Sequence, residues 1–577
     1  MPLALPRFTE LDPALSPSPS PVEQTLETVV WIASSVTSRL GVTPPLLLLS
    51  LLTLALIYND RLVFTRPRRK ELSRPKGLPL IGNTIDIIRL GTVQQFERFH
   101  ENMRDSKVGF HVTFPVTKSM IMFYRPEYIE YIQKTNFENF VKGPAFRDRF
   151  KDLLGETGIF VSDGQSWKTQ RKMASHIFSV YQFRTWVQRV VFGELDHVIP
   201  ILDALSDSKA VAQGRNKVLL PDLFFRYTLA SFGKMAFATD MKCLTSSPEC
   251  LEEDVAFSVA FDFVQGVINK RFVTPWWKIS ERFSKEGKLN RRYVEEMRTF
   301  GLGIIDDRLS RRAAGLDKSD KDSKDGKDLL DLFMDLTTDR EELLVVLLNF
   351  IIAGRDTTAQ GLSWLFYELI RQPQHIGEIR REIESVLGNA QEVGEDGKVK
   401  KLAYEQVKEL PYTLACYSEA LRLHPPVAKN GKLVLKDDVI VPQGATAKDL
   451  PPIRVYAGEQ LSWSDWVIAR NPDVWGEDAA EFNPERFIEY DDKGVRGFKN
   501  HGQWKYHVFN GGPRLCLGMN LANFEALALL SAVVPRYDFE WASREEGQQA
   551  DWPLQYLNSV THPSQNYLVK VSRRAAA

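Results

Sequence analysis

The sequence predicts a large globular domain with long helices behind an N-terminal membrane anchor, and three observations favour this organisation. The 577 residues are 44% hydrophobic and 26% charged, which provides the apolar material of a large core. An uncharged run fills residues 40–59. Long apolar stretches with helical character follow at residues 338–370 and 519–534.

Charge and cysteine content narrow the class of protein. The formal net charge is zero, so composition gives no overall attraction to nucleic acid, and no nucleic acid partner is expected. The four cysteines are too few and too scattered for a disulfide framework, which favours a reducing compartment. Cys243 and Cys250 are interpreted as ordinary thiols of a surface loop. No HExxH or CxxC motif is present, which argues against a zinc site.

The uncharged run is long enough to cross a membrane, because about 20 apolar residues span a bilayer as a helix. Basic residues follow it and acidic residues precede it, so the positive-inside rule places the main domain in the cytosol. A buried or interfacial helix is the alternative. The predicted organisation is a lumenal or flexible segment at 1–39, a transmembrane anchor at 40–60, a basic and Pro/Gly-rich hinge at 61–83, and the main domain at 84–577.

Residues 338–370 predict an unusually long helix through the centre of that domain. Thr338 and Glu341 have the spacing of a capping box, and Pro373 follows the end. The charged, low-complexity stretch at 317–328 lies before this helix and predicts a solvated loop within the domain.

The middle of the long helix contains GRDTT at 354–358, in which glycine and β-branched hydroxyl residues weaken the helix. One interpretation is a kink where small residues let a neighbour pack closely. The other is a gap beside Gly354, where an acid and a hydroxyl make a polar pocket in an apolar wall.

Two further motifs lie in the C-terminal third. Glu419 and Arg422 stand three residues apart on one face of a predicted helix, and FNPERF supplies Arg486 downstream. A surface ion pair is the ordinary interpretation of such spacing. The stretch FNGGPRLCLG at 509–518 places Cys516 in a glycine-rich loop, as either a reactive or metal-bound sulfur or a buried thiol in a turn.

AGRDTT, ExxR, PERF and FxxGxRxCxG occur in this order, and together they resemble the cytochrome P-450 family of haem-thiolate monooxygenases. The resemblance runs from about residue 75 to the C-terminus. It implies a mainly α fold with small β-sheets (α+β), formed by one haem domain behind the N-terminal anchor.

The resemblance implies that Cys516 is the metal ligand, as the axial thiolate of haem b (iron protoporphyrin IX). Gly512 and Gly518 are then expected to let the backbone approach the ring and the sulfur closely. Phe509 resembles the aromatic residue that packs beside the proximal face of the haem. Backbone N–H groups and the start of the following helix are expected to favour the anionic sulfur.

Four further residues resemble the family's haem-propionate ligands. Arg514 matches the donor in the cysteine loop, and Trp167 and Arg171 match the family's WxxxR. By spacing alone, Trp167 and Arg171 are more often a packed helix face. Lys432 falls where many relatives have an arginine, and lysine keeps the charge but loses the bidentate fork.

The resemblance also assigns roles to the remaining motifs. Glu419, Arg422 and Arg486 resemble a structural triad near the proximal side of the haem. Thr357 and Asp356 are expected to deliver protons to the distal oxygen while the haem activates O2 and one oxygen atom enters a C–H bond. A haem protein that binds gas or redox partners without oxidising a substrate is the alternative, and the pair Thr357 and Asp356 favours the oxygenase.

No GxGxxG or P-loop motif indicates a flavin or nicotinamide site. The resemblance therefore implies that NADPH acts indirectly, through an NADPH–cytochrome reductase on the cytosolic face of the endoplasmic reticulum membrane. Lys168 and Lys172 share a helix face that either docks an acidic reductase or is simply solvated.

Residues 142–179 and 349–364 resemble the fatty-acid and alkane ω-hydroxylase branches of fungi and plants. The expected apolar substrate is a long-chain fatty acid or alkane, hydroxylated at or near its terminal C–H. A fungal secondary metabolite or a xenobiotic hydrocarbon is the alternative. The residues that fall where that family lines its pocket, each of which could equally be plain core, are Phe146, Leu154, Ile159, Phe160, Phe350, Val427 and Ala428.

Overall fold

The structure is a computed structural model, and it describes residues 44–57, 69–75, 82–89, 92–104, 106, 108–113, 120–178, 180–274, 276–315, 328–389, 399–543 and 567–574. The chain divides into two compact units. The smaller unit comprises residues 1–68, 76–84 and 113–117, and the larger comprises 69–75, 85–112 and 118–577.

The smaller unit contains helix α2, Pro44–Ile57, whose 14 residues are apolar except for Ser50 and Thr53. Its leucine side chains are at least half exposed where they are described, as for Leu48 and Leu49, each 61% exposed. The flanking parts of the predicted anchor lie outside the described residues. Among the residues that the structure describes, no helix is both long and apolar enough to cross a bilayer.

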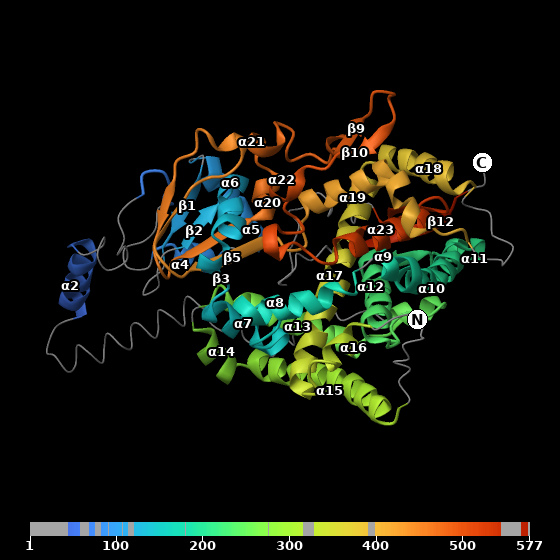
Figure 1. The fold of residues 1–577 in the computed structure, drawn as a ribbon, viewed down its shortest axis with the longest axis horizontal. Coiled ribbons are helices and arrows are strands. Elements are labelled where there is room, and N and C mark those ends of the chain that lie inside the picture. The colour runs from blue at the N-terminus through green and yellow to red at the C-terminus, as the bar shows by residue number, and fades with distance from the viewer. Residues whose placement is uncertain are drawn as a thin grey trace. The chain divides into compact units, whose positions relative to one another are not determined.

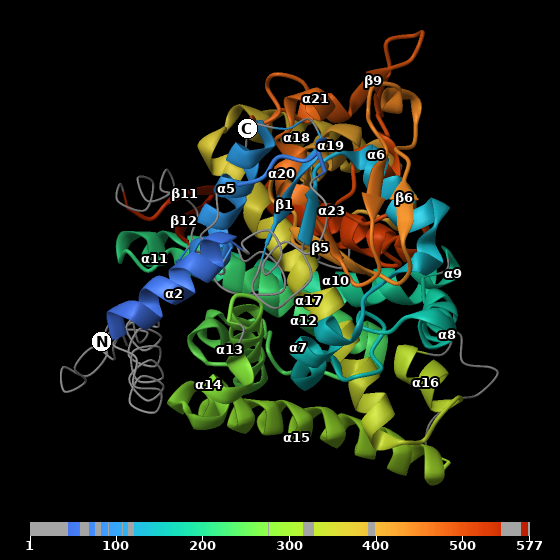
Figure 2. The same ribbon diagram turned by 90° about the vertical axis from the view of Figure 1, so that its left-hand side faces the viewer.

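The larger unit is mainly helical and is organised around α17, Arg340–Arg371. This helix confirms the predicted long central helix, and it remains α-helical through Gly354. It packs against α12 (Leu220–Phe237), α15 (Lys285–Ala313) and α19 (Pro411–Leu423). Figures 1 and 2 show α17 between the five-stranded sheet above it and helices α13, α14 and α15 below it.

The cap of α17 differs from the predicted one. Asp339, not Thr338, is the N-cap residue, and its Oδ1 accepts hydrogen bonds from the backbone N–H of Glu341 at 2.8 Å and of Glu342 at 3.0 Å. The predicted capping box at Thr338 is therefore wrong by one residue. The carboxylate of Asp339 reaches two unpaired N–H groups and adds a negative charge at the helix start.

The remaining helices surround this centre. Their bounds are α4 Thr84–Arg89, α5 Thr92–Arg104, α6 Pro126–Glu130, α7 Pro144–Leu154, α8 Gly164–Ser175, α9 Val180–Gln182, α10 Gln188–Ser206, α11 Ser208–Ala212, α13 Ala256–Arg271, α14 Trp277–Phe283, α16 Leu329–Met334, α18 Gln374–Leu387, α20 Asp465–Ala469, α21 Pro472–Trp475, α22 Gly502–Lys505 and α23 Met519–Val533. Residues 316–327, most of the predicted solvated loop, lie outside the described residues.

Small β-sheets accompany the helices, as predicted. The five-stranded sheet has the order β1 (Gly109–Val112), β2 (Met120–Phe123), β8 (Gln460–Ser464), β5 (Lys429–Val434) and β3 (Phe140–Val141). Only β2 and β8 pair in parallel within it. The other sheets are β11 (Tyr537–Trp541), β12 (Leu568–Arg573) and β4 (Lys217–Leu219); β6 (Asp438–Ile440) with β7 (Ile453–Val455); and β9 (Ile488–Tyr490) with β10 (Arg496–Phe498).

One cysteine differs from its predicted environment. Cys243 is only 2% exposed, so its interpretation as a surface-loop thiol is wrong. Arg226 of α12 donates from Nη1 to the carbonyl oxygen of Cys243 at 3.2 Å, which holds this loop against the helix. Burial raises the pKa of the Cys243 thiol to about 12, which keeps the group protonated. Cys250 is partly exposed.

Candidate functional site

The loop before α23 brings Cys516 back toward Phe509. The N–H of Cys516 donates to the carbonyl oxygen of Phe509 at 2.8 Å, which closes the loop. Gly512 has φ +59°, and a Cβ there would lie 2.7 Å from the carbonyl oxygen of Gln133. Glycine is therefore needed at 512 by the neighbouring backbone. At Gly518 a Cβ would make only an ordinary contact, 3.9 Å from the sulfur of Cys516.

The sulfur of Cys516 is held as a potential anion. Cys516 is exposed, and the protein that surrounds it raises the pKa of its thiol by desolvation. The backbone N–H groups of Gly518 and Met519 hydrogen-bond to it, and the charge of Arg171 also acts to lower this pKa. Because α23 starts at Met519, the positive end of its dipole lies beside the sulfur.

Cationic side chains gather around two aromatic rings near this loop. The guanidinium carbon of Arg514 lies 4.1 Å from the ring centre of Trp167, and that of Arg171 lies 5.9 Å from it. Trp167 is 4% exposed and contacts Phe137 at 5.5 Å between ring centres. The ammonium of Lys432 lies 5.1 Å from the ring centre of Phe137. The structure thus brings together four residues that the sequence predicts to share one ligand.

Lys142 belongs to the same group, so we define the cation cluster as Lys142, Arg171, Lys432 and Arg514. Burial, aided by the like charge of Arg514, lowers the pKa of Lys142 to about 8. Burial lowers the pKa of Lys432 well below its usual value, and Lys142 and Arg514 lower it further. The charges of the cluster therefore repel one another in a poorly solvated place.

Negative charge near the cluster is scarce. Asp163 accepts from Nη2 of Arg514 at 3.2 Å and from the backbone N–H of Lys142 at 3.0 Å. Burial still lowers the pKa of Arg514 to about 10. Within the described part of the chain, Nζ of Lys432 and Nε of Arg514 have no hydrogen-bond partner. Buried donors without acceptors are costly, so the cluster has the character of a site for an anionic group.

Lys142 and Asp163 are two residues of this site to which the sequence assigned no role. Each is the charged residue directly before a glycine and a helix, in KGPAF and in DGQSW, and that placement is their only sequence signal. Their proximity to Arg514 depends on the loops that precede α7 and α8, which sequence spacing does not reveal.

The middle of α17 presents two different faces. Thr357 is half-buried, and its hydroxyl donates to the carbonyl oxygen of Ala353 at 2.7 Å. Ala353, one turn earlier, is also partly exposed, whereas the residues between them are buried. Gly354 is required by packing, because a Cβ there would lie 2.0 Å from the ring of Phe232. Close packing at Gly354 is therefore confirmed, although the helix remains α-helical there. The predicted gap beside Gly354 is wrong, because the ring of Phe232 fills that space.

Asp356 lies in the buried part of the helix, with 1% exposure. Its Oδ1 accepts from Nη1 of Arg355 at 3.0 Å and its Oδ2 accepts from Nε2 of Gln265 at 2.8 Å. Burial raises the pKa of Asp356 to about 6, while the charge of Arg355 opposes that rise. The carboxyl therefore titrates close to neutral pH. It hydrogen-bonds to Gln265 of α13 and not to Thr357.

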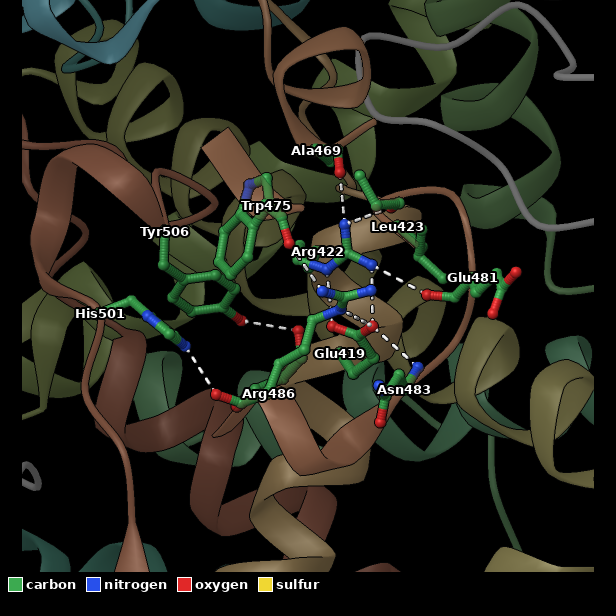
Figure 3. A network of polar contacts seen from close by, with 12 residues as sticks. Glu419, Arg422, Leu423, Ala469, Trp475, Glu481, Asn483, Arg486, His501 and Tyr506 are labelled. Atoms are coloured by element: carbon green, nitrogen blue, oxygen red, sulfur yellow. Dashed lines mark hydrogen bonds and ion pairs between the residues drawn. The ribbon is translucent and has the colours of Figure 1, made fainter. Parts of the chain in front are cut away.

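Glu419, Arg422 and Arg486 form a buried network, shown in Figure 3. Two nitrogens of Arg422 donate to the two carboxylate oxygens of Glu419, at 2.6 and 2.8 Å. Nε of Arg486 lies 3.3 Å from Oε1 of Glu419. The side chains of Glu419 and Arg422 are 0% and 1% exposed, which excludes the surface ion pair.

The other donors of this network reach backbone carbonyl oxygens, and Nη2 of Arg486 also pairs with the carboxylate of Asp478 at 2.6 Å. Arg422 donates to Ala469, and Nη1 of Arg486 donates to Trp475 at 2.7 Å (Figure 3). Arg422 also donates to Ala479 at 2.8 Å. The network therefore ties α19 to the irregular segment that includes α21.

The predicted pocket-lining residues have mixed environments. Leu154, Ile159, Phe350 and Ala428 are buried, whereas Phe160 is 40% exposed. Phe146 contacts Phe150 at 4.6 Å and Phe272 at 6.2 Å between ring centres, so it belongs to an aromatic cluster between α7 and the end of α13.

The predicted docking lysines are both exposed on α8. Nζ of Lys168 lies 2.9 Å from Oε1 of Glu138, and both of these side chains are more than half exposed. Such a pair is weak and screened by salt, so it competes little with an acidic partner.

Comparison with known proteins identifies the arrangement. The model of the family described as "Cytochrome P450" matches residues 72–571. The chain belongs to the cytochrome P450 family. This P450 is 36% identical over 512 residues to "Cytochrome P450 monooxygenase cyp1" of Mycosarcoma maydis, covering 87% of this chain and 75% of the relative.

Plant proteins are also similar. "Cytochrome P450 94A1" of Vicia sativa is 30% identical, over 81% of this chain and 85% of its own length. "Cytochrome P450 94C1" of Arabidopsis thaliana is 32% identical, over 73% and 78%. The protein is a cytochrome P450 monooxygenase. The family implies a haem-thiolate cofactor and generally uses a reductase partner.

Proposed function

We propose that this P450 hydroxylates a long-chain fatty acid or alkane at or near its terminal C–H, with Cys516 as the thiolate ligand of haem b. One observation carries the cofactor assignment: the thiol of Cys516 lies close enough to the cation cluster for the charge of Arg171 to lower its pKa. The N–H groups of Gly518 and Met519 also approach this thiol. A thiolate and a set of buried cations are the two features that a haem with carboxylate side chains requires.

The cation cluster fits the two propionates of haem. Its residues carry more positive charge than Asp163 balances, and the unpartnered nitrogens of Lys432 and Arg514 are donors suited to carboxylate oxygens. Trp167 and Arg171 are further candidates for binding the propionates. Lys142 adds a donor from outside the motifs that predicted this site. When bound, the haem supplies activation of O2 and insertion of one oxygen atom into a C–H bond.

Residues of α17 supply the protons in this proposal. Thr357 carries its hydroxyl on the partly exposed face of α17, where Oγ1 can accept a hydrogen bond as well as donate one to Ala353. Asp356, one residue earlier, has a pKa of about 6 that suits reversible proton uptake near neutral pH. Water is the expected carrier between the two, because their side chains leave different faces of the helix.

The substrate class follows from the resemblance to the ω-hydroxylase branches and from apolar side chains. Leu154, Ile159 and Phe350 are buried hydrocarbon side chains, and Phe146 belongs to an aromatic cluster with Phe150. Apolar side chains suit an alkyl chain, and they provide few polar groups that could orient a polar substrate.

Electrons are proposed to come from an NADPH–cytochrome reductase at the cytosolic face of the endoplasmic reticulum. The exposed lysines Lys168 and Lys172 of α8 support docking of an acidic partner. The exposed leucines of α2 support membrane anchoring, because such a surface is unfavourable in water.

The cofactor assignment is tested by the absorption spectrum of the reduced protein with carbon monoxide. The wild type and the Cys250→Ser control should show the spectrum of thiolate-ligated haem, and Cys516→His should not. A Cys516→His protein with the wild-type spectrum would show that another residue ligates the iron.

The substrate class is tested by the shift of the Soret band when a ligand displaces axial water. Fatty acids and alkanes of 12 to 18 carbons, roughly the chain length that fills a pocket of several hundred Å3, are compared with terpenoids. Shifts with terpenoids alone would replace the proposed substrate with a secondary metabolite.

A further inference from the structure

Helices α13 and α17 are joined by four polar side chains, which we call the α13 clamp: Asp262, Gln265, Arg355 and Asp356. Asp262 and Gln265 stand three residues apart and therefore on one face of α13. Nη1 of Arg355 donates to Asp262 at 2.7 Å and to Asp356 at 3.0 Å. Gln265 donates to the other oxygen of Asp356 at 2.8 Å.

The clamp contains one cation for two carboxylates. Arg355 is 3% exposed, and its guanidinium lies 4.8 Å from the ring centre of Phe225, so it has little freedom to leave. Nη2 of Arg355 adds a second hydrogen bond to Asp262 at 3.2 Å, whereas Asp356 accepts a single hydrogen bond from Arg355. Asp262 therefore competes with Asp356 for the same positive charge.

Gln265 offers the carboxyl of Asp356 two kinds of bond. Its Nε2 donates to a carboxylate, and after rotation of the amide its Oε1 accepts from a protonated carboxyl. In the described part of the chain Oε1 of Gln265 is buried and has no hydrogen-bond partner, so this acceptor is not committed elsewhere. The amide of Gln265 can thus hydrogen-bond to Asp356 in both of its protonation states.

We propose that Asp262 and Gln265 of α13 are positioning residues for Asp356, which they orient and tune as a proton carrier in the oxygenation proposed above. The inference rests on that proposed function, and it adds that the proton supply of α17 is controlled from α13.

The two positioning residues act in opposite directions on the same group. The negative charge of Asp262 raises the pKa of Asp356, and the hydrogen bond from Gln265 lowers it. The other charged group facing this carboxyl is Arg355, which lowers the pKa. Asp262→Asn should therefore make Asp356 a stronger acid, and Gln265→Leu should make it a weaker one.

The test compares Asp262→Asn and Gln265→Leu in the haem-loaded protein, with Asp356→Asn as reference and the exposed Asp254→Asn as matched control. The carboxyl stretching band of Asp356, identified by its loss in Asp356→Asn, is followed by infrared spectroscopy against pH in the resting protein. We expect its midpoint to fall by about one pH unit in Asp262→Asn and to rise by about one in Gln265→Leu. Asp254→Asn should leave it unchanged.

The same variants are then assayed for product formed per NADPH consumed against pH. We expect the pH dependence to shift in the two opposite directions seen by infrared spectroscopy. A role in packing alone would not reverse sign between the two variants. Midpoints that stay fixed, or that move the same way in both variants, would overturn the inference.

Two mixed results remain decisive. If the infrared midpoints shift as expected while the pH dependence of product per NADPH does not change, the role in proton supply is overturned. The proposed oxygenase function is then unaffected. If the midpoints shift but no fatty acid or alkane is oxidised by any form, the proposed substrate class fails while control of Asp356 by α13 is supported.

Discussion

Two groups of buried charged residues in this P450 differ in how completely their charges are matched. Around Glu419, both oxygens accept hydrogen bonds, and the donors of Arg422 and Arg486 reach that carboxylate, the carboxylate of Asp478 or backbone carbonyls. In the cation cluster, Asp163 is the acid that bonds to Arg514, and Nζ of Lys432 has no hydrogen-bond partner among the described residues.

The difference separates architecture from binding. Burying charge is costly, and full pairing offsets that cost within the protein itself. The network of Glu419, Arg422 and Arg486 therefore supports the fold and offers nothing to a ligand. A buried set of cations with unused donors instead favours an anionic ligand, because the ligand supplies the missing acceptors.

The largest expected effect comes from breaking the matched network. Arg422→Leu leaves the buried carboxylate of Glu419 with few donors, and removal of one partner of such a pair costs about 3–5 kcal/mol of unfolding free energy. Urea unfolding and the yield of haem-loaded protein measure this loss. The control is Arg292→Leu, which removes an exposed pair with Glu296, and it should change stability by no more than ~1 kcal/mol. Equal effects of the two substitutions would contradict the structural role.

The second prediction applies the opposite change to the unmatched cluster. Lys432→Met removes a buried cation without an acceptor, so the apoprotein should unfold at the same or a higher urea concentration. Haem affinity should fall by about 10-fold or more, because a charged hydrogen bond to the ligand is lost. Lys436→Met, at an exposed position two residues after β5, is the control. A destabilised apoprotein with unchanged haem affinity would assign Lys432 to the fold.

Glu525 is a buried charged-residue side chain that also lacks a full set of partners, and the third prediction asks whether such a group must bind a ligand. This α23 carboxyl accepts from the hydroxyl of Ser231 at 2.6 Å, and its Oε2 has no partner among the described residues. Unlike an arginine, a carboxyl can become neutral, and burial raises the pKa of Glu525 to about 8.

The sign of the pH effect follows from proton uptake. The folded protein keeps this proton up to about pH 8, whereas the unfolded chain loses it near the usual value of a glutamate. Stability should therefore fall as pH rises between these limits, by up to ~1.4 kcal/mol per pH unit. Glu525→Gln should remove that slope in urea unfolding measured across neutral pH. An unaltered slope would mean that Glu525 is ionised in the folded state.

The smallest effect on stability is expected at Thr357, whose hydroxyl is already paired with Ala353. Thr357→Ala should change the unfolding free energy by less than about 1 kcal/mol. Product per NADPH should fall roughly 2- to 10-fold, less than the ~100-fold of a sole general acid because water replaces the hydroxyl, and hydrogen peroxide per NADPH should rise. Ser363→Ala is the control, because Ser363 makes the same bond to a carbonyl one turn earlier, at 2.7 Å. Unchanged coupling in Thr357→Ala would leave Thr357 without a part in proton supply.

Local features of this P450 were predictable from sequence because neighbouring residues produce them. Apolar periodicity and a following proline predicted α17 to within two residues at each end, although the cap moved to Asp339. The spacing of Glu419 and Arg422 predicted one helix face. Family resemblance indicated Trp167, Arg171, Lys432 and Arg514, which the structure brings together, but not Lys142.

Contacts between distant segments were decided only by the tertiary structure. Asp163 meets Arg514 across 351 positions, Gln265 meets Asp356 across 91, and no local pattern encodes either distance. The burial of Cys243 depends likewise on Arg226 of another element. Sequence determined which residues form helices and which loop carries the thiol, because these depend on backbone preference and short-range spacing. Which charges are matched and which remain for a ligand depends on the solvent exclusion and side-chain geometry that packing creates, and that was decided in three dimensions.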